Sequence, residues 1–324
     1  KLTIEEKKRI LLAHIFGVDI DAQAVEVTKL SLLLKALEGE NDATLSMQFG
    51  LFHERALPNL SENIRCGNSL IGPDYFSGTL IPDDEEIRRV NAFDWSEGFP
   101  AAMSDGGFDC IIGNPPYGLL QDANRDDAQM EYFKRENEVA SFKVDTYHLF
   151  MERSTGLVRE GGHISMITPA NFMTNNHLAK LRMHLIDKLN IEHIVVINGG
   201  VFEKVSVDNA IFVAKREAKK AATFDVIRAE STGASLRLSG KTTIKISDVR
   251  ASEFTLFTGG ADVALGKVWR HIEKEGVQLG EIAKVNFGKQ LRDRKIHKCD
   301  VIEVTSVNSV PRTHRPCYGG KDIQ

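Results

Sequence analysis

Hydrophobic positions in the first two thirds of the chain follow two periods, one typical of buried strands and one typical of amphipathic helices. Continuous apolar runs predict strands at 14–20, 108–112, 164–168 and 191–197. Apolar residues at helical spacing over 24–37, 147–158 and 178–189 predict helices between them. Strands that alternate with helices are typical of parallel sheets covered on both faces, so the pattern predicts a doubly wound α/β fold.

The alternation weakens along the rest of the chain. Residues 207–215 and 223–228 predict two strands with no helix between them, which suits an antiparallel hairpin at the sheet's edge. Short β-prone stretches follow over 231–258, and then an amphipathic segment over 262–275. Polar composition predicts an irregular insertion over 69–107 and a mobile loop over 121–144 that closes over a substrate. We therefore predict one domain over 1–230, a connector over 231–276 and the start of a second domain over 277–324.

Composition narrows the class of protein. The chain has 324 residues with 42% hydrophobic content, enough for a full core, and no apolar run approaches the ~20 residues of a membrane span. No basic-plus-apolar leader precedes it. The four cysteines lack metal-type spacing, which favours reduced thiols in a cytoplasmic protein and predicts no metal site.

Charge is unevenly distributed. The net charge is −4, yet from Val277 onward nine Lys and Arg stand against five Asp and Glu, a local balance of +4 that leaves −8 for the rest. A basic C-terminal part suits phosphate neutralisation on nucleic acid, although a solvated charged surface remains the alternative.

The most informative motif is Gly113-Asn114-Pro115-Pro116-Tyr117, directly after the apolar run 108–112. A buried strand delivers such a loop to the ligand-binding edge of an α/β sheet. The Asn114 amide oxygen and the Pro115 carbonyl can both accept hydrogen bonds from one substrate N–H₂, because the two proline rings stiffen the turn. Tyr117 then offers a flat face on which a ring can stack.

At these residues the chain resembles the S-adenosylmethionine-dependent amino methyltransferases, in particular the N6-adenine DNA methyltransferases of restriction-modification systems, including type IIG-like fused endonuclease-methylases. Asn-Pro-Pro-Tyr is the catalytic signature of that family. Four further segments resemble family segments in the same order: 14–21, 66–70, 161–172 and 200–214. The resemblance implies a Rossmann-like methyltransferase domain over 1–230 and a DNA-recognition domain that starts near 277.

The resemblance also implies roles for individual residues. It places Asp19 and Ile20 at the cofactor ribose, Asn68 and Ser69 at the cofactor adenine, and Phe202 against the flipped base. Alternatives stay open: Asp19 as a helix N-cap, with Asp21 the better cap; Asn68 as a turn residue; and Asn-Pro-Pro as a surface turn. Tyr117 and Phe202 can also be core aromatics, and His148 and His163 are interpreted as structural.

One expected part of the family pattern is absent. The glycine-rich cofactor loop and its strand precede the acidic strand in that family, but nothing in 1–13 is glycine-rich. Circular permutation through 258–262 is rejected, because Asp19 precedes Asn114 here. We expect the chain to be a piece of a longer enzyme, whose missing N-terminal segment, with or without a nuclease domain, completes the sheet. Without it, two strands expose unpaired N–H and C=O groups.

The predicted activity is methyl transfer from S-adenosylmethionine to the N6 amine of a flipped adenine in double-stranded DNA. Alternatives are methylation of a protein glutamine amide, since those enzymes share Asn-Pro-Pro-Tyr, methylation of RNA adenine, and a non-catalytic DNA-binding fragment. No nuclease constellation of Pro-Asp and Glu-Xaa-Lys is evident in the sequence.

Overall fold

The computed structural model describes residues 2–38, 58–78, 81–121, 126–140, 144–198, 208–231 and 235–251, together with 271–272, 275–277 and 281. The chain divides into two compact units, 1–262 and 263–324, and every element named below lies in the first. None of the described helices is long and apolar enough to cross a membrane. The amphipathic segment predicted over 262–275 and the basic C-terminal part fall largely or wholly outside the described residues.

The first elements form a small layer of two helices and two short strands: α1 (Ile4–His14), β1 (Gly17–Asp19), α2 (Ala22–Leu37) and β2 (Ile64–Cys66). β1 and β2 pair in parallel, with Asp19 opposite Cys66. The Asp21 side chain accepts hydrogen bonds from the first turn of α2, which confirms Asp21 as the N-cap and Asp19 as the last residue of a strand.

The segment over 69–107 is not irregular, so that prediction was wrong. It holds the 3₁₀ turn η1 (Pro73–Phe76) and the short helices α4 (Asp84–Val90), α5 (Trp95–Gly98) and α6 (Pro100–Ser104). Asp83 and Asp94 cap α4 and α5, and Pro100 stands at the start of α6. The acidic patch that begins at Asp83 therefore lies at a helix N-terminus, where the helix dipole favours negative charge.

A six-stranded mixed sheet forms the centre of the unit, in the order β3-β4-β6-β5-β7-β8. The strands are β3 (Phe108–Gly113), β4 (Val158–Pro169), β5 (Asn190–Asn198), β6 (Asn209–Lys215), β7 (Thr223–Ser231) and β8 (Leu236–Lys245). β3 is parallel to β4 and β5 to β7, whereas β6 runs antiparallel to both of its neighbours and β8 antiparallel to β7. The protein is thus a mixed α/β protein, and its sheet is not wholly parallel.

The position of β6 corrects the predicted edge hairpin. β6 and β7 do not pair with each other; β6 lies between β4 and β5, and β7 lies beside β5. β6 pairs antiparallel with β5 along most of its length. β6 occupies the inner side of β5, and β7 takes the outer side.

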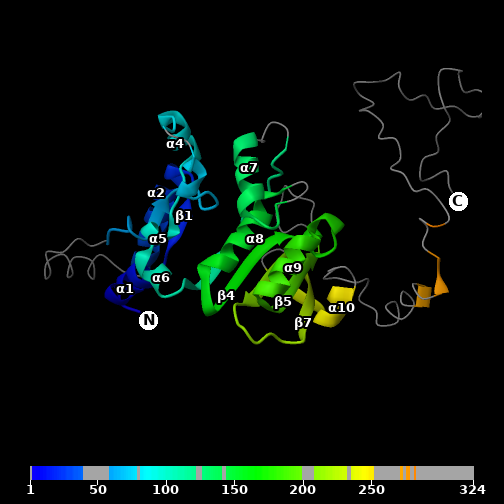
Figure 1. Ribbon diagram of the computed structural model, residues 1–324. Coiled ribbons are helices and arrows are strands. Elements are labelled where there is room, and N and C mark those ends of the chain that lie inside the picture. Colours follow the sequence, from blue (N-terminus) through cyan, green and yellow to red (C-terminus); the bar gives the residue numbers. More distant parts are fainter. Residues whose placement is uncertain are drawn as a thin grey trace, which may run out of the picture. The chain divides into compact units, whose positions relative to one another are not determined.

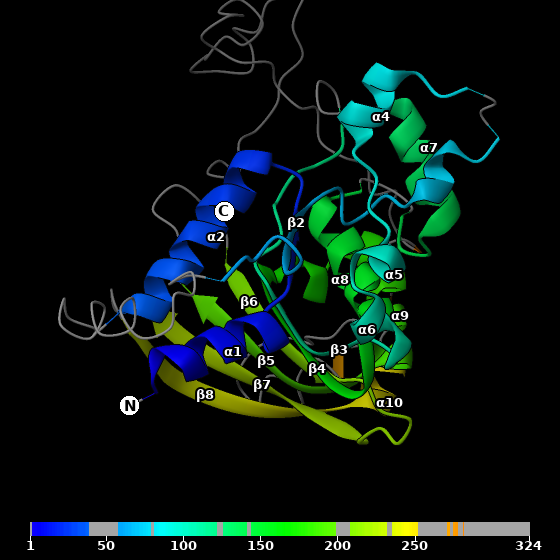
Figure 2. The same cartoon turned by 90° about the vertical axis from the view of Figure 1, so that its left-hand side faces the viewer.

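Helices cover one face of this sheet (Figure 1). α8 (Thr146–Leu157) packs on β4 and on α9 (Ala179–Lys188), which in turn contacts β5. α7 (Asp127–Glu136) lies in the region predicted as a mobile loop, and it is helical because Met130, Tyr132 and Phe133 bury one side of it. The 3₁₀ turns η3 (Ala170–Met173) and η4 (Asn176–Leu178) join β4 to α9, and α10 (Ile246–Ala251) follows β8. Figure 2 shows α8 and α9 side by side.

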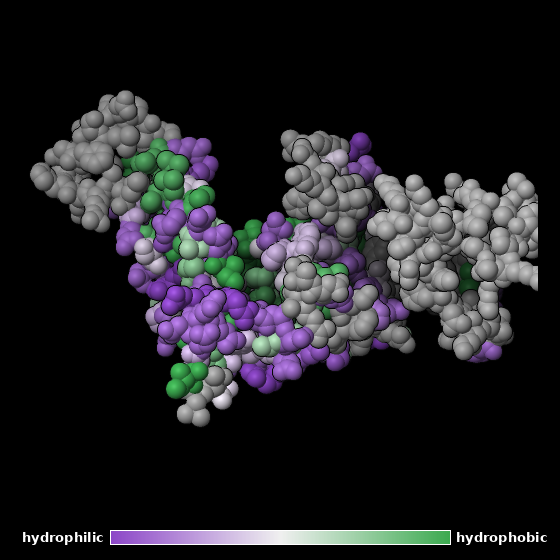
Figure 3. Space-filling view, turned by 90° about the horizontal axis from the view of Figure 1, so that it is seen from above, coloured by the Kyte–Doolittle hydropathy of each residue, from purple (hydrophilic) through white to green (hydrophobic). Residues whose placement is uncertain are grey.

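Four strands, β1, β2, β3 and β8, have a partner on one side only among the described residues. In that part of the chain β1 pairs with β2 and β3 pairs with β4. On β3, Ile112 is 85% exposed, and on α2 the residues Val27, Leu30 and Leu34 form an exposed apolar stripe. Figure 3 shows hydrophobic residues at the surface of the part that carries α2, on the left of that view. Apolar surface therefore concentrates near the unpaired edges.

Candidate active site

The diproline corner follows β3 directly. Gly113 is the last residue of the strand; Asn114 is exposed, Pro115 is buried and Pro116 is exposed. Pro115 fixes one side of the corner in the core while the Asn114 side chain reaches solvent. The corner thus lies at the carboxyl end of a strand, where open α/β sheets bind ligands. The predicted strand and loop are confirmed, whereas the roles of Asn114, Pro115 and Pro116 stay predictions.

Tyr117 is half-buried, with its hydroxyl turned toward the strands. The hydroxyl oxygen lies 3.4 Å from Asn114 Oδ1, 3.3 Å from the Ile167 carbonyl oxygen and 3.3 Å from Asn209 Oδ1. Burial raises the pKa of the Tyr117 phenol, so the hydroxyl keeps its proton and donates. One proton serves these three acceptors, and one of them is the amide oxygen of Asn114. Stacking of Tyr117 on a base stays a prediction.

The ring of Tyr117 packs edge-on against Tyr147, with centroids 6.3 Å apart. Tyr147 is buried in α8, and its hydroxyl donates to Asn171 Oδ1 at 2.7 Å. Asn209, the first residue of β6, is only 1% exposed. Side chains of α8 and β6 thus reach Tyr117, and Asn171 of η3 contacts Tyr147.

The N-terminus of α8 is hydrogen-bonded to the chain that follows the corner. Thr146 Oγ1 donates to the Pro116 carbonyl at 2.6 Å, and the Gly118 N–H donates to Asp145 Oδ1 at 2.9 Å. The Thr146 N–H donates to the Gly118 carbonyl at 3.1 Å, and Leu119 forms an antiparallel bridge with Asp145. Burial raises the pKa of the Asp145 carboxyl, although backbone N–H groups that hydrogen-bond to it act in the opposite direction.

Sequence reasoning missed these contacts. Asp145 and Thr146 could have been recognised as a helix start, because a polar pair precedes an apolar stripe at helical spacing. Asn209 was a second signal, since an amide within an apolar strand requires buried hydrogen-bond partners. Neither signal identifies the partner.

The second group of predicted residues lies on β1 and β2. The Gly67 N–H donates to the Asp19 carbonyl at 2.9 Å, so the chain after β2 lies beside the end of β1. Asp19 Oδ1 accepts the Asp21 N–H at 2.8 Å, and the Ile20 carbonyl lies 3.6 Å from the Cys66 sulfur. The side chains of Asp19 and Ile20 are exposed.

Asn68 and Ser69 are held in a defined turn. Asn68 Oδ1 accepts the Leu70 N–H at 3.1 Å, which leaves its N–H₂ as the group suited to contact a ligand. The Ser69 carbonyl accepts the Trp95 indole N–H at 3.1 Å. A Cβ at Gly67 would lie 2.7 Å from the Phe93 ring, so only glycine fits there. The structure therefore brings Asp19, Ile20, Asn68 and Ser69 together.

The corner after β3 and the residues after β1 and β2 lie on different sheets. The two sheets contact each other near the first residues of β1 and β3. Phe16 precedes β1 and Phe108 begins β3, and their ring centroids are 5.9 Å apart. Trp95 and Phe99 also contact Phe108, at 5.9 and 5.7 Å. Phe202 lies outside the described residues, so its predicted contact with the base stays a prediction.

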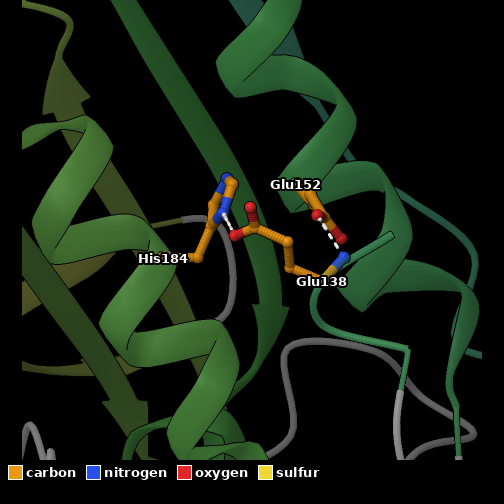
Figure 4. A group of neighbouring side chains, drawn as sticks. All are labelled: Glu138, Glu152 and His184. Carbon is orange, nitrogen blue, oxygen red and sulfur yellow. Dashed lines mark hydrogen bonds and ion pairs between the residues drawn. The ribbon is translucent and has the colours of Figure 1, made fainter. Parts of the chain in front are cut away.

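Glu138, Glu152 and His184 form a separate cluster, whose ligand-type atoms lie within 4.8 Å of one another (Figure 4). His184 Nδ1 lies 3.1 Å from Glu138 Oε2, which lowers the Glu138 pKa, and Nε2 lies 2.9 Å from Thr155 Oγ1. Glu152 accepts the Glu138 N–H at 2.8 Å. These hydrogen bonds tie the chain after α7 to α8 and α9, so we assign the cluster a structural role.

Comparisons with known proteins agree on the class: the matched relatives are methyltransferases of restriction-modification systems. A model described as "Eco57I restriction-modification methylase" matches residues 13–202, more than half of the chain, and the chain therefore belongs to that family.

Individual relatives are much longer than this chain. The type II restriction enzyme and methyltransferase RM.Eco57I of Escherichia coli is 33% identical over 196 residues, which cover 60% of this chain and 18% of the relative. The type II methyltransferase M.TthHB8I of Thermus thermophilus is 27% identical over 213 residues, 63% of this chain and 46% of the relative. The solved type IIG restriction endonuclease BpuSI is 18% identical with a TM-score of 0.37, over 48% of this chain and 21% of that one. The chain spans less than half the length of these proteins.

Proposed function

We propose that this chain forms part of an enzyme that transfers a methyl group from S-adenosylmethionine to the N6 amine of adenine in a specific DNA sequence. The observation that carries the proposal is the diproline corner at the carboxyl end of β3, where the Asn114 side chain is exposed and its oxygen lies next to the Tyr117 hydroxyl. Family membership supports methylation within a restriction-modification system.

The corner suits an amine because of its acceptors. The Asn114 amide oxygen and the Pro115 carbonyl would accept the two N–H bonds of adenine N6. Those bonds would favour a tetrahedral nitrogen. Its lone pair would form the N–CH3 bond as the S–CH3 bond of the donor breaks and S-adenosylhomocysteine leaves, and the surplus proton on nitrogen would pass to water. Positioning and dipoles aimed at the charge that grows on nitrogen supply this catalysis, so no strongly shifted acid or base is required.

The residues on β1 and β2 fit the cofactor. S-adenosylmethionine supplies the electrophilic methyl group. Asp19, exposed at a strand end with one oxygen engaged by the Asp21 N–H, presents a carboxylate of the kind that accepts ribose hydroxyls. The Asn68 N–H₂ would donate to an adenine ring nitrogen, since its oxygen is used within the turn. This arrangement, together with the mixed sheet, supports a Rossmann-like methyltransferase fold.

DNA as the substrate demands base flipping. An adenine inside a duplex cannot reach the corner, so it must be extruded at a cost of a few kcal/mol. Tyr117, and Phe202 if it lies nearby, would offset that cost by stacking. We assign duplex DNA recognition to the basic residues from 277 onward and place the enzyme in the cytoplasm.

The decisive test is transfer of a labelled methyl group to duplex DNA by the full-length protein. Tritium from S-adenosylmethionine should appear in N6-methyladenine. Asn114→Ala should lower turnover by about 10²-fold or more, because both acceptors act on the transition state. Asn137→Ala is the matched control, since the Asn137 side chain donates to the Phe133 carbonyl at the end of α7 and not to the corner.

Label on a product other than DNA adenine would contradict the proposed activity and identify a different one. Label on a protein glutamine would identify an amide methyltransferase, and label on RNA adenine would change the substrate class. Wild-type turnover that Asn114→Ala leaves unchanged would show that the corner does not hold the amine.

A further inference from the structure

The first two residues of the α8 start, Asp145 and Thr146, contact the chain on both sides of Tyr117. The peptide group before Tyr117 carries the Pro116 carbonyl, which accepts from Thr146 Oγ1 at 2.6 Å. The peptide group after Tyr117 carries the Gly118 N–H, which donates to Asp145 Oδ1 at 2.9 Å. The two hydrogen bonds therefore hold the two peptide planes that flank one residue.

Two held planes determine a backbone conformation. The φ angle of Tyr117 relates its Cα to the preceding peptide plane, and its ψ angle relates Cα to the following one. Proline fixes φ at Pro116 but leaves ψ free, so the carbonyl that Thr146 holds is the remaining soft element of the corner. Two backbone hydrogen bonds join the same two segments further along. The Thr146 N–H donates to the Gly118 carbonyl at 3.1 Å, and the Leu120 N–H donates to the Val144 carbonyl at 3.0 Å.

The conformation of Tyr117 matters because its hydroxyl lies 3.4 Å from Asn114 Oδ1. We propose that Asp145 and Thr146 are positioning residues for methyl transfer: they fix Tyr117, and the Tyr117 hydroxyl in turn orients the Asn114 amide toward the substrate amine. This inference rests on the proposed adenine methylation. Neither residue touches the substrate, so their effect passes through Tyr117.

Thr146 offers a clean pair of variants in the full-length protein. Thr146→Val keeps the shape but removes the hydroxyl, whereas Thr146→Ser keeps the hydroxyl. We expect Thr146→Val to lower kcat roughly tenfold, because small displacements at a reacting centre have effects of that order or more. KM for S-adenosylmethionine and Kd for duplex DNA should stay within about twofold, and Thr146→Ser should restore most of kcat.

A double substitution separates positioning from general structural damage. If Thr146 acts through the phenol, Thr146→Val should add little to the loss already caused by Tyr117→Phe. Ser154→Ala is the matched control in the same helix. Its hydroxyl donates to the Met151 carbonyl within α8 and not to the corner, so the kcat of this variant should equal that of the wild type.

A second pair covers the case in which Thr146→Val does not fold. Asp145→Asn retains an oxygen that accepts the Gly118 N–H, whereas Asp145→Ala does not; only the alanine variant should lower kcat. Wild-type kcat in both Thr146→Val and Asp145→Ala overturns the inference. So does a loss that is additive with Tyr117→Phe, or one that weakens cofactor and DNA binding equally. Absence of label in N6-methyladenine with the wild-type enzyme would instead refute the proposed function.

Discussion

The two sheets of this protein differ in how completely they are built. In the six-stranded sheet, the four inner strands have partners on both sides, and residues such as Ile194, Phe212 and Val226 are essentially inaccessible to water. The two-stranded sheet has three residues per strand, and among the described residues its core cluster consists of Val25, Leu60 and Ile64 with a few half-buried neighbours. The six-stranded sheet is stabilised by its own packing, whereas little buried surface stabilises the two-stranded sheet.

The two halves of the candidate site, around Asn114 and around Asp19 and Asn68, therefore differ in how firmly they are held. Asn114 follows a strand that is paired and covered on one side, and α8 holds the chain beyond it. Asp19 and Asn68 stand on a layer whose neighbouring helix α2 exposes an apolar stripe. The half that carries Asn114, the predicted amine site, is thus preformed, whereas the predicted cofactor half, which carries Asp19 and Asn68, exposes apolar surface.

The largest expected effect compares one substitution in the two halves. Leu185→Ala, at a fully buried position of α9, should lower the free energy of unfolding by about 2–5 kcal/mol because it leaves a cavity. Leu34→Ala, at a position of α2 that is 57% exposed, should change it by no more than about 0.5 kcal/mol. Urea unfolding of the 324-residue chain measures both. A loss above about 1 kcal/mol at Leu34 would show that α2 is covered in solution.

A buried histidine should give the well-packed half a pH effect of its own. Burial lowers the pKa of His148, which is 4% exposed in α8, to about 4 from 6.5. Between those values the unfolded chain binds the proton and the folded chain does not. Stability is therefore complete above pH 6.5 and falls as pH drops toward 4, by up to roughly 3 kcal/mol. Unfolding measured at pH 7 and pH 5 should show less pH dependence in His148→Asn; equal slopes would contradict the assignment.

Two glycines test how tightly the cofactor half is packed. Gly67→Ala would place a Cβ 2.7 Å from the Phe93 ring, and overpacking of this kind costs about 1–3 kcal/mol. Gly240→Ala in β8 meets no atom within 4 Å and should be neutral or stabilise by up to about 1 kcal/mol. Thermal unfolding compares the two variants. If Gly67→Ala is tolerated as well as Gly240→Ala, the turn after β2 is loosely packed.

The sequence predicted most element positions because hydrophobic period is a local property. β1, α2, β3, α9 and β5 all lie where the apolar runs placed them, and Asp21 caps α2 as expected. The helix α7 was missed because its three buried residues are scattered among charged ones. Strand order was beyond reach, since the place of β6 between β4 and β5 depends on long-range pairing that periodicity does not encode.

The candidate site divides in the same way. Asn-Pro-Pro-Tyr after an apolar run predicted the corner and its place at a strand end. The hydrogen bonds that hold it come from Thr146, 30 positions from Pro116, and from Asp145, 27 positions from Gly118. They join side chains to backbone groups, which every residue possesses, so no residue-type pattern reveals them.

The smallest expected effect asks whether the two halves unfold together. Asp21 accepts hydrogen bonds from Gln23 and Ala24 N–H at the start of α2, at 2.7 and 3.4 Å, and loss of such a cap costs about 1 kcal/mol. Global unfolding registers that loss only if α2 unfolds in the same transition as the six-stranded sheet. Asp21→Ala should therefore lower stability by about 1 kcal/mol in a single cooperative transition, and Asp21→Asn, which keeps the cap, should not.

A different result for Asp21→Ala would sharpen the comparison. If the main urea transition is unchanged while amide protons of α2 exchange faster with solvent, the two-stranded layer opens on its own. Amide protons of β4 and β6, which have ladder partners on both sides, should keep their protection in that case. The layer of β1, β2 and α2 would then be a cooperative unit separate from the six-stranded sheet.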